Sequence, residues 1–246
     1  MTKASDFKEL SRVIMKYYKR GVITNCFLSA DSMKCEISEG NLTYDAQDDF
    51  LNIFVRRDGF SRLYFYALNE QVVWQDLPEK TVCDFSGDDK GILKNNGFDE
   101  YISRIRLENS MGFSDEIEIT KASGKDFEEI IAVSEQAFDK YSGYFPSETE
   151  IKKEISEEKI YVKRIDGCVA GFLESGISGK KAEIKHLCTA ESFRRRGVAR
   201  ELVKMFLAEN PQSIVWTGEQ NNAAAALYES MGFKRDECRS TVYMKG

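Results

Sequence analysis

The sequence predicts an α/β (α+β) protein with a mixed sheet, divided into two domains at residues 1–112 and 113–246. Amphipathic helical patterns alternate with short β-type stretches along the whole chain. Two Asp-Gly pairs, Asp58-Gly59 and Asp166-Gly167, stand between apolar stretches, as in antiparallel hairpins. Residues 108–115 are small and polar and break the periodicity, so we expect the domain boundary there.

The first domain is expected to begin with a helix and to continue with a meander of strands. Apolar residues form one stripe over residues 6–20, and Gly21 is a suitable helix stop. A later short helix is expected to end at Asn95-Asn96, before Gly97. Strands are predicted at residues 22–29, 34–38, 42–44, 50–55, 62–68, within 71–84, and at 101–107.

The second domain is expected to contain strands and helices in a mixed order. An aromatic loop is predicted at residues 141–146, and Ser147 with Glu150 has the spacing of a capping box. Helices are predicted at residues 126–138, 147–158, 198–209 and 222–230, and strands at 116–120, 160–164, 168–174, 182–189, 213–217 and 239–244.

Composition excludes several classes of function. The chain has 246 residues, of which 42% are hydrophobic and 31% charged, as in soluble globular proteins. Its net charge is −6, shared equally by the two halves, so a nucleic-acid partner is not expected. No apolar stretch reaches the roughly 20 residues that span a bilayer, so no membrane association is expected. The N-terminal residues also lack the apolar core of a signal peptide.

The six cysteines are scattered and form no C-x-x-C pair, and the chain has a single histidine. A zinc site needs several such ligands at close spacing, so no metal is expected. Scattered cysteines without a leader are typical of reduced thiols, and a cytoplasmic location is therefore expected.

The most informative stretch is a strand, a basic loop and a helix in that order, at residues 182–209. Unpaired N–H groups and the helix dipole make the first turn of the helix a site for anions. Gly197 lets the backbone approach a ligand, and the arginines before it add charge. The loop has neither P-loop nor dinucleotide-fingerprint spacing. The alternative is an ordinary connection with a solvated basic turn.

The pattern Arg194-x-x-Gly197-x-Ala199 resembles the R/Q-x-x-G-x-G/A signature of the GNAT superfamily of acyl-CoA-dependent N-acyltransferases. A second pattern, N-x-x-A-x-x-L-Y-x-x-x-G-F over residues 221–233, resembles a motif that follows the first in that family. The resemblance covers about residues 116–246, and the expected element order there matches the GNAT fold.

The first domain shows a weaker internal likeness to the second. A helix, a glycine, a phenylalanine and a strand follow one another at Gly97-Phe98 and again at Gly232-Phe233. We interpret residues 1–112 as a degenerate GNAT-like copy that lacks the coenzyme motif. The alternative is that this succession is a common way to end a helix.

The resemblance implies that acetyl-CoA is the cosubstrate and that an amine attacks its thioester directly, in a ternary complex. The loop amides would hold the pyrophosphate, and a bulge near the end of strand 182–189 would splay the sheet for the pantetheine arm. The implied coenzyme-binding residues are Leu187, Cys188, Thr189, Arg194, Arg195, Arg196, Gly197, Val198, Ala199, Arg200 and Asn221. Asn221 could equally be a helix N-cap.

The resemblance also implies the catalytic residues. Tyr228 matches the family tyrosine that protonates the departing thiolate, although a packed core tyrosine is the alternative. Glu183 matches the strand glutamate that deprotonates the amine in the histone-acetyltransferase branch.

Other residues could take these chemical roles. Glu219, Glu174 or a water path are the alternative bases to Glu183. His186 is expected on the opposite strand face from Glu183, as a packed or surface residue. Cys188 is a weak candidate nucleophile, because no partner base has sequence support.

The leading hypothesis is an acetyl-CoA-dependent N-acetyltransferase that acts on a primary amine of a small molecule or peptide. The alternative is a non-catalytic acyl-CoA-binding sensor or interaction module. The sequence leaves open the acceptor amine, the role of residues 1–112 and the oligomeric state, with a homodimer among the options.

Overall fold

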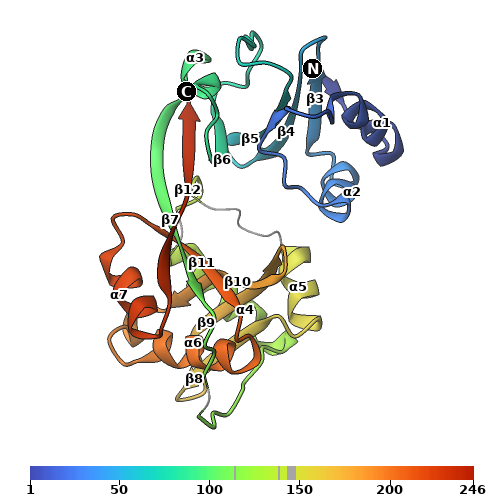
Figure 1. Cartoon of the computed structure of the whole chain (residues 1–246). Helices are drawn as coiled ribbons and strands as arrows, with labels where there is room; N and C mark the ends of the chain where they lie inside the picture. The colour runs from blue at the N-terminus through green and yellow to red at the C-terminus, as the bar shows by residue number, and fades with distance from the viewer. Residues whose placement is uncertain (114, 138, 143–147) are drawn as a thin grey trace. The chain divides into compact units, whose positions relative to one another are not determined.

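The computed structural model describes residues 1–113, 115–137, 139–142 and 148–246, and their chain divides into two units (Figure 1). The first unit is Met1–Ser103 with Arg239–Gly246, and the second is Arg104–Cys238. Strands β7 (Asp99–Asn109) and β12 (Lys234–Lys245) each run from one unit into the other. This division differs from the predicted boundary at residue 112. The start of the second unit pairs with β11, and the last residues of the chain pair with β6.

The first unit has a mixed sheet in the order β1-β3-β4-β5-β6-β12, with β2 pairing to β5. Only β5 and β6 are parallel among these pairs. Its strands are β1 (Thr2–Lys3), β2 (Ile23–Thr24), β3 (Leu42–Ala46), β4 (Phe50–Arg57), β5 (Phe60–Ala67) and β6 (Thr81–Ser86), and its helices are α1 (Phe7–Tyr17), α2 (Ala30–Ser38) and α3 (Ile92–Asn95).

Apolar side chains cover the two faces of this sheet. Leu10 of α1 and Met33 of α2 pack on one face, whereas Trp74 and Leu93 pack on the other. The predicted strand at 34–38 is wrong, because these residues belong to α2. Ser29 caps that helix by accepting a hydrogen bond from the Ser32 N–H, and this local bond starts a helix where the sequence alternates like a strand.

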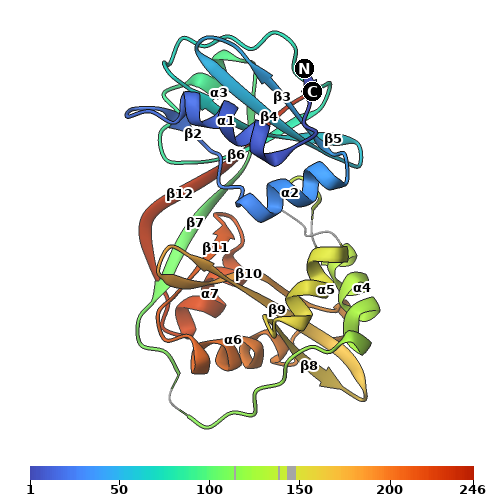
Figure 2. The ribbon, with the colours of Figure 1, turned by 90° about the vertical axis from the view of Figure 1, so that its right-hand side faces the viewer.

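The second unit has the sheet order β7-β11-β10-β9-β8. Its strands are β8 (Ile160–Ile165), β9 (Cys168–Ser178), β10 (Lys181–Thr189) and β11 (Ser213–Gly218), and its helices are α4 (Phe127–Ala137), α5 (Glu148–Ser156), α6 (Val198–Glu209) and α7 (Asn222–Ser230). Helices α4 and α5 pack together on one face through Ile130 and Ile155, and α6 and α7 cover the other through Phe206 and Tyr228 (Figure 2). The predicted mixed α/β fold class is confirmed.

The segment before α4 differs from its prediction. Residues 116–120 form no strand, and this part of the chain meets β8 through two backbone bonds, from Val162 N–H to Thr120 O and from Ala122 N–H to Ile160 O. The expected capping residue Ser147 and most of the aromatic loop lie outside the described residues. A capping box does form earlier, where Ser123 and Asp126 exchange hydrogen bonds before α4.

Candidate active site

The sheet of the second unit opens between β10 and β11. These parallel strands pair only through Ala182–Ile184 of β10 and Ser213–Val215 of β11. Beyond that point β10 stays paired with β9 as far as Thr189, while β11 stays paired with β7 as far as Gly218. Two adjacent strands therefore continue in the sheet without pairing to each other, and we refer to this opening as the splay.

A β-bulge lies where the splay begins. The register between β10 and β9 shifts between Ile184 and His186, so that Lys185 is the extra residue. A bulge bends its strand and increases the local twist, which separates β10 from β11. The sequence-based expectation of a bulge near the end of this strand agrees with its position three residues before Cys188.

Backbone groups of Leu187 and Thr189 face the splay. Ala190 donates its N–H to Ala170 O, on the β9 side. Alternate residues of a strand direct their N–H and C=O groups to the same neighbour, so Cys188 also faces β9 and the residues on either side of it face away from β9. Leu187 and Thr189 thus present hydrogen-bonding groups where an extended ligand could add to the sheet.

The arginine loop connects β10 to α6. Arg195 and Gly197 both adopt left-handed backbone conformations, with φ of +64° and +83°. Gly197 is the N-cap of α6 and supplies no side-chain cap, so the N–H groups of Val198, Ala199 and Arg200 begin the helix without one. Val198 is buried under β9, whereas the three arginines before Gly197 are exposed. This is the geometry of an anion site at the N-terminus of a helix.

Two of the expected coenzyme residues make structural contacts of their own. The Arg200 guanidinium donates to Ser230 Oγ at 2.9 Å and lies 3.5 Å from Met231 Sδ, which ties α6 to the end of α7. Asn221 caps α7 by accepting a hydrogen bond from the Ala224 N–H at 3.1 Å. A capping role is therefore present at Asn221, and its role toward the coenzyme stays a prediction.

Tyr228 is buried in the core on the α6–α7 side of the sheet. Its ring meets Phe233 edge-on, with centroids 5.5 Å apart. Burial, and after it the Cys188 thiol, raise the pKa of Tyr228 well above its ordinary value. The phenol therefore keeps its proton at neutral pH, as a general acid must.

Cys188 is not suited to act as a nucleophile. Its side chain is buried on the α4–α5 side of the sheet. Burial raises the pKa of the Cys188 thiol to about 12, although Arg194 acts in the opposite direction. A thiol of this kind holds too little thiolate to attack a thioester.

Glu183 and His186 lie on the same face of β10, and the expectation that they lie on opposite faces is wrong. Glu183 is opposite Gly176 of β9, and His186 is opposite Glu174. Positions 174 and 176 alternate onto one face, so the two β10 residues share it as well. The expectation assumed that side chains alternate regularly between the two faces. The bulge at Lys185 adds one residue, so every later residue of β10 lies on the opposite face from the one expected. Burial raises the pKa of Glu183 despite its cationic neighbours.

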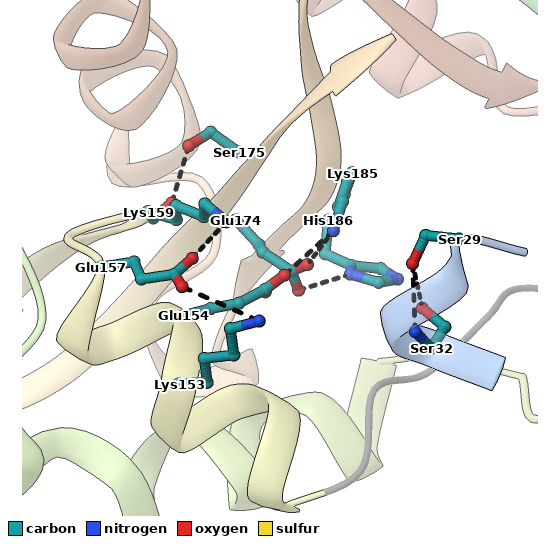
Figure 3. A network of polar contacts seen from close by, with 10 residues as sticks. All are labelled: Ser29, Ser32, Lys153, Glu154, Glu157, Lys159, Glu174, Ser175, Lys185 and His186. Atoms are coloured by element: carbon teal, nitrogen blue, oxygen red, sulfur yellow. Dashed lines mark hydrogen bonds and ion pairs between the residues drawn. The ribbon is translucent and has the colours of Figure 1, made fainter. Parts of the chain in front are cut away.

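Beside Glu183, four ionisable side chains form a network on the α5 side of the sheet (Figure 3). His186 Nδ1 lies 2.8 Å from Glu174 Oε2, and Lys185 Nζ lies 3.3 Å from Glu174 Oε1. Lys185 also contacts Glu154 Oε1 of α5, at 3.0 Å. Burial disfavours ionisation of Glu174, but the hydrogen bond and charge of His186 outweigh it and lower the pKa of that carboxyl.

Glu154 behaves in the opposite way within this network. Burial and the adjacent Glu174 carboxylate raise the pKa of Glu154. Its Oε2 is buried and has no hydrogen-bond partner among the described residues. Glu154 was not among the residues predicted from the sequence. The available signal was a glutamate next to Ile155, three residues after Ile151, on the buried face of an amphipathic helix.

The other base candidates differ in position. Glu174 contacts both Lys185 and His186 and has a lowered pKa, so it is a poor proton acceptor. Glu219 is exposed in the turn between β11 and α7. Within the described residues, no group of three or more potential ligands could hold a metal ion, and no helix is long and apolar enough to cross a bilayer.

Comparison with known proteins identifies a family for this half of the chain. Residues 127–233 match the model of the acetyltransferase (GNAT) family. No curated protein sequence matches the chain.

Several solved structures share the fold at low identity. A GNAT-family acetyltransferase from Colwellia psychrerythraea is 12% identical, with a TM-score of 0.58 over 99% of this chain and 98% of that chain. A GCN5-related N-acetyltransferase from Sphaerobacter thermophilus is 11% identical, with a TM-score of 0.53 over 100% and 95% of the two chains. One from Kribbella flavida is 12% identical, with a TM-score of 0.54 over 87% and 93%.

Proposed function

The C-terminal half of this chain belongs to the GNAT superfamily of acetyltransferases, and on that premise we propose that the protein transfers an acetyl group from acetyl-CoA to a primary amine. The observation that carries the proposal is the splay between β10 and β11, which leads directly into the arginine loop and the first turn of α6. An extended acyl-pantetheine arm suits the splay, and a pyrophosphate suits the loop.

In this proposal, each part of the coenzyme has its own partners. The N–H groups of the first turn of α6 and the side chains of Arg194–Arg196 bind the pyrophosphate. Leu187 and Thr189 pair their backbone with the pantetheine arm, and a backbone N–H from this strand polarises the thioester carbonyl. None of the six cysteines forms a disulfide, which suits the reducing cytoplasm that we propose as the location.

The proposed chemistry needs a base and an acid. Glu183 removes a proton from the acceptor ammonium, and the resulting amine attacks the thioester carbon. The tetrahedral intermediate collapses with loss of the coenzyme thiolate, which takes the proton of the Tyr228 hydroxyl. Tyr228 is then restored by the second amine proton. The high pKa of the Tyr228 phenol keeps the acid loaded before each turnover, and the raised pKa of Glu183 makes it a better base.

The first experiment is titration calorimetry of acetyl-CoA into the protein and into two variants. Gly197→Trp should abolish binding, because its side chain projects over the anion site. Gly167→Trp is the matched control: both glycines have φ of +83° and no atom within 4 Å of an added Cβ, but Gly167 lies in the β8–β9 hairpin. Binding that survives in Gly197→Trp, or that is absent from the unmodified protein, would refute the coenzyme site.

The second experiment separates an enzyme from a non-catalytic acyl-CoA sensor. The protein is screened against primary amines with detection of free coenzyme A thiol. Tyr228→Phe should keep acetyl-CoA affinity and lower kcat by about 10². Full turnover in this variant would refute the acid role. Binding without turnover of any amine would support the sensor.

A further inference from the structure

The network beside the splay connects β10 to helix α5 through three buried side chains and Lys185, which is 39% exposed. Side-chain exposure is 4% for Glu174, and 12% for both His186 and Glu154. The network therefore runs from the strand that would hold the thioester to the helix on the outer face (Figure 3). His186 directly precedes Leu187, whose backbone faces the splay, so one end of the network lies within one residue of the proposed reaction centre.

The contacts within the network define one order of groups. Glu174 accepts from His186 and pairs with Lys185, and Lys185 pairs with Glu154. When Nδ1 of a neutral imidazole donates to a carboxylate, Nε2 is the nitrogen that can take up a proton. The carboxylate then stabilises the imidazolium that forms.

Charge balance links the two ends. With His186 neutral and Glu154 protonated, the charges of Lys185 and Glu174 cancel. With His186 protonated and Glu154 ionised, the sum over the four groups is again zero. Three of the four groups are buried, and burial disfavours a net charge, so proton uptake at His186 is favoured when Glu154 releases its proton.

We propose that His186, Glu174 and Glu154 form a charge-compensated proton relay that takes over, at β10, the acceptor proton removed by Glu183 and releases a proton to solvent at α5. This inference rests on the proposed acetyl transfer. Glu183 and His186 occupy consecutive positions on one face of β10, about 7 Å apart along a strand. Glu174 acts through His186 and is a positioning residue, whereas Glu154 exchanges a proton with solvent.

The proton balance of one turnover closes. The ammonium gives one proton to Glu183, which passes it to His186 through a bridging water, and Glu154 loses one proton to solvent. The second amine proton restores Tyr228 after the thiolate has become a thiol. Between turnovers, His186 releases its proton and Glu154 regains one, so the net release is one proton for each amide formed.

The charged groups around the relay are few among the described residues. From β10 they are Glu183 and Lys185, and from β7 Arg106 influences Glu183. The other charged residues in this part of α5 and just after it pair at the surface: Lys152 with Glu148, and Glu157 with Lys153 and Lys159.

The test uses the fact that His186 is the only histidine of the chain. Its imidazole resonance is therefore assigned without ambiguity, and its titration by NMR needs neither coenzyme nor acceptor. Glu154→Gln should lower the midpoint of His186 by about one pH unit, because compensation is lost. Glu174→Gln should lower it as well. Glu157→Gln, a surface glutamate that follows α5, should leave it unchanged.

Kinetics at the same pH values complete the test. His186→Gln should lower kcat by at least about tenfold and leave the Kd for acetyl-CoA unchanged. In Glu154→Gln the acidic limb of kcat/KM for the amine should move to lower pH together with the His186 midpoint. An unchanged midpoint in Glu154→Gln, or full kcat in His186→Gln, would overturn the relay. A protein that binds no acetyl-CoA would instead refute the proposed function, whatever the NMR titration shows.

Discussion

Substitution of Gly171 by alanine tests whether the contact between β9, β10 and α6 fixes the coenzyme loop. Gly171 lies opposite Thr189, at the end of the splay. An added Cβ would lie 2.5 Å from the Cys188 carbonyl oxygen and 2.8 Å from Val198 Cγ1. Favourable contacts of carbon atoms begin near about 3.5 Å, so the two strands would have to separate by about 1 Å.

The loss of stability caused by this separation should lie near the upper end of the values known for overpacked sites. Extra methyl groups in packed sites cost about 1–3 kcal/mol, and here one of the obstructing atoms belongs to the backbone. We therefore expect Gly171→Ala to lower the free energy of unfolding of the second unit by about 3 kcal/mol and its Tm by about 6–12 °C. Acetyl-CoA binding should weaken as well, because Cys188 and Val198 flank the arginine loop.

Urea unfolding can be followed in the second unit alone. Trp216 lies in β11 of the second unit and Trp74 in the core of the first, so a Trp74→Phe background leaves Trp216 as the reporter. Gly124→Ala is the control, because an added Cβ there meets no atom within 4 Å. If Gly171→Ala were as stable as this control and bound acetyl-CoA normally, the reasoning about close packing behind the loop would be refuted.

Three further predictions concern single side chains. Asp126→Asn should cost about 2 kcal/mol at pH 7, since Asp126 accepts bonds from Arg164 and Ser123 that hold its pKa down against burial. The unmodified protein should lose this stability as pH falls through the lowered pKa of Asp126. Urea titrations between pH 7 and pH 3 give the difference in free energy of unfolding between the two proteins, and a difference that stays constant would contradict the prediction. Cys188→Ala should keep turnover, and mass spectrometry should find no acyl-enzyme; an acylated Cys188 would contradict direct transfer. Asn25→Ala should destabilise the first unit by about 3 kcal/mol, because the buried amide bonds to three backbone groups, and unfolding followed at Trp74 would reveal a smaller loss.

The sequence predicted best where the chain carries local stop and start signals. Helices α6 and α7 begin and end at the predicted residues, since Gly197 and Asn221 define their N-termini. The strand predicted at residues 116–120 does not form, and the reason is physical. Ile117 packs against the core from an irregular segment. Such packing gives the sequence the apolar–polar alternation of a strand, although the backbone makes no strand pairing there.

Only part of the candidate site could be predicted from the sequence. The arginine loop was found because its residues are consecutive. The shared face of Glu183 and His186 depends on one bulged residue, and a bulge leaves no local signature in this stretch. The partnership of Glu154 with Glu174 joins a helix to a strand, and such contacts follow from packing rather than from spacing.

The placement of β12 has a consequence for synthesis on the ribosome. Residues Ser240–Lys245 pair with β6, and Ser240 Oγ donates to Asp84 across a separation of 156 residues. The first unit therefore lacks one strand of its sheet until the second unit and residues 240–245 have been translated. Its nascent β6 must present an open edge during that time, whereas most N-terminal domains can close while they emerge. The sheet of the first unit can thus be completed only after the second unit has been synthesised.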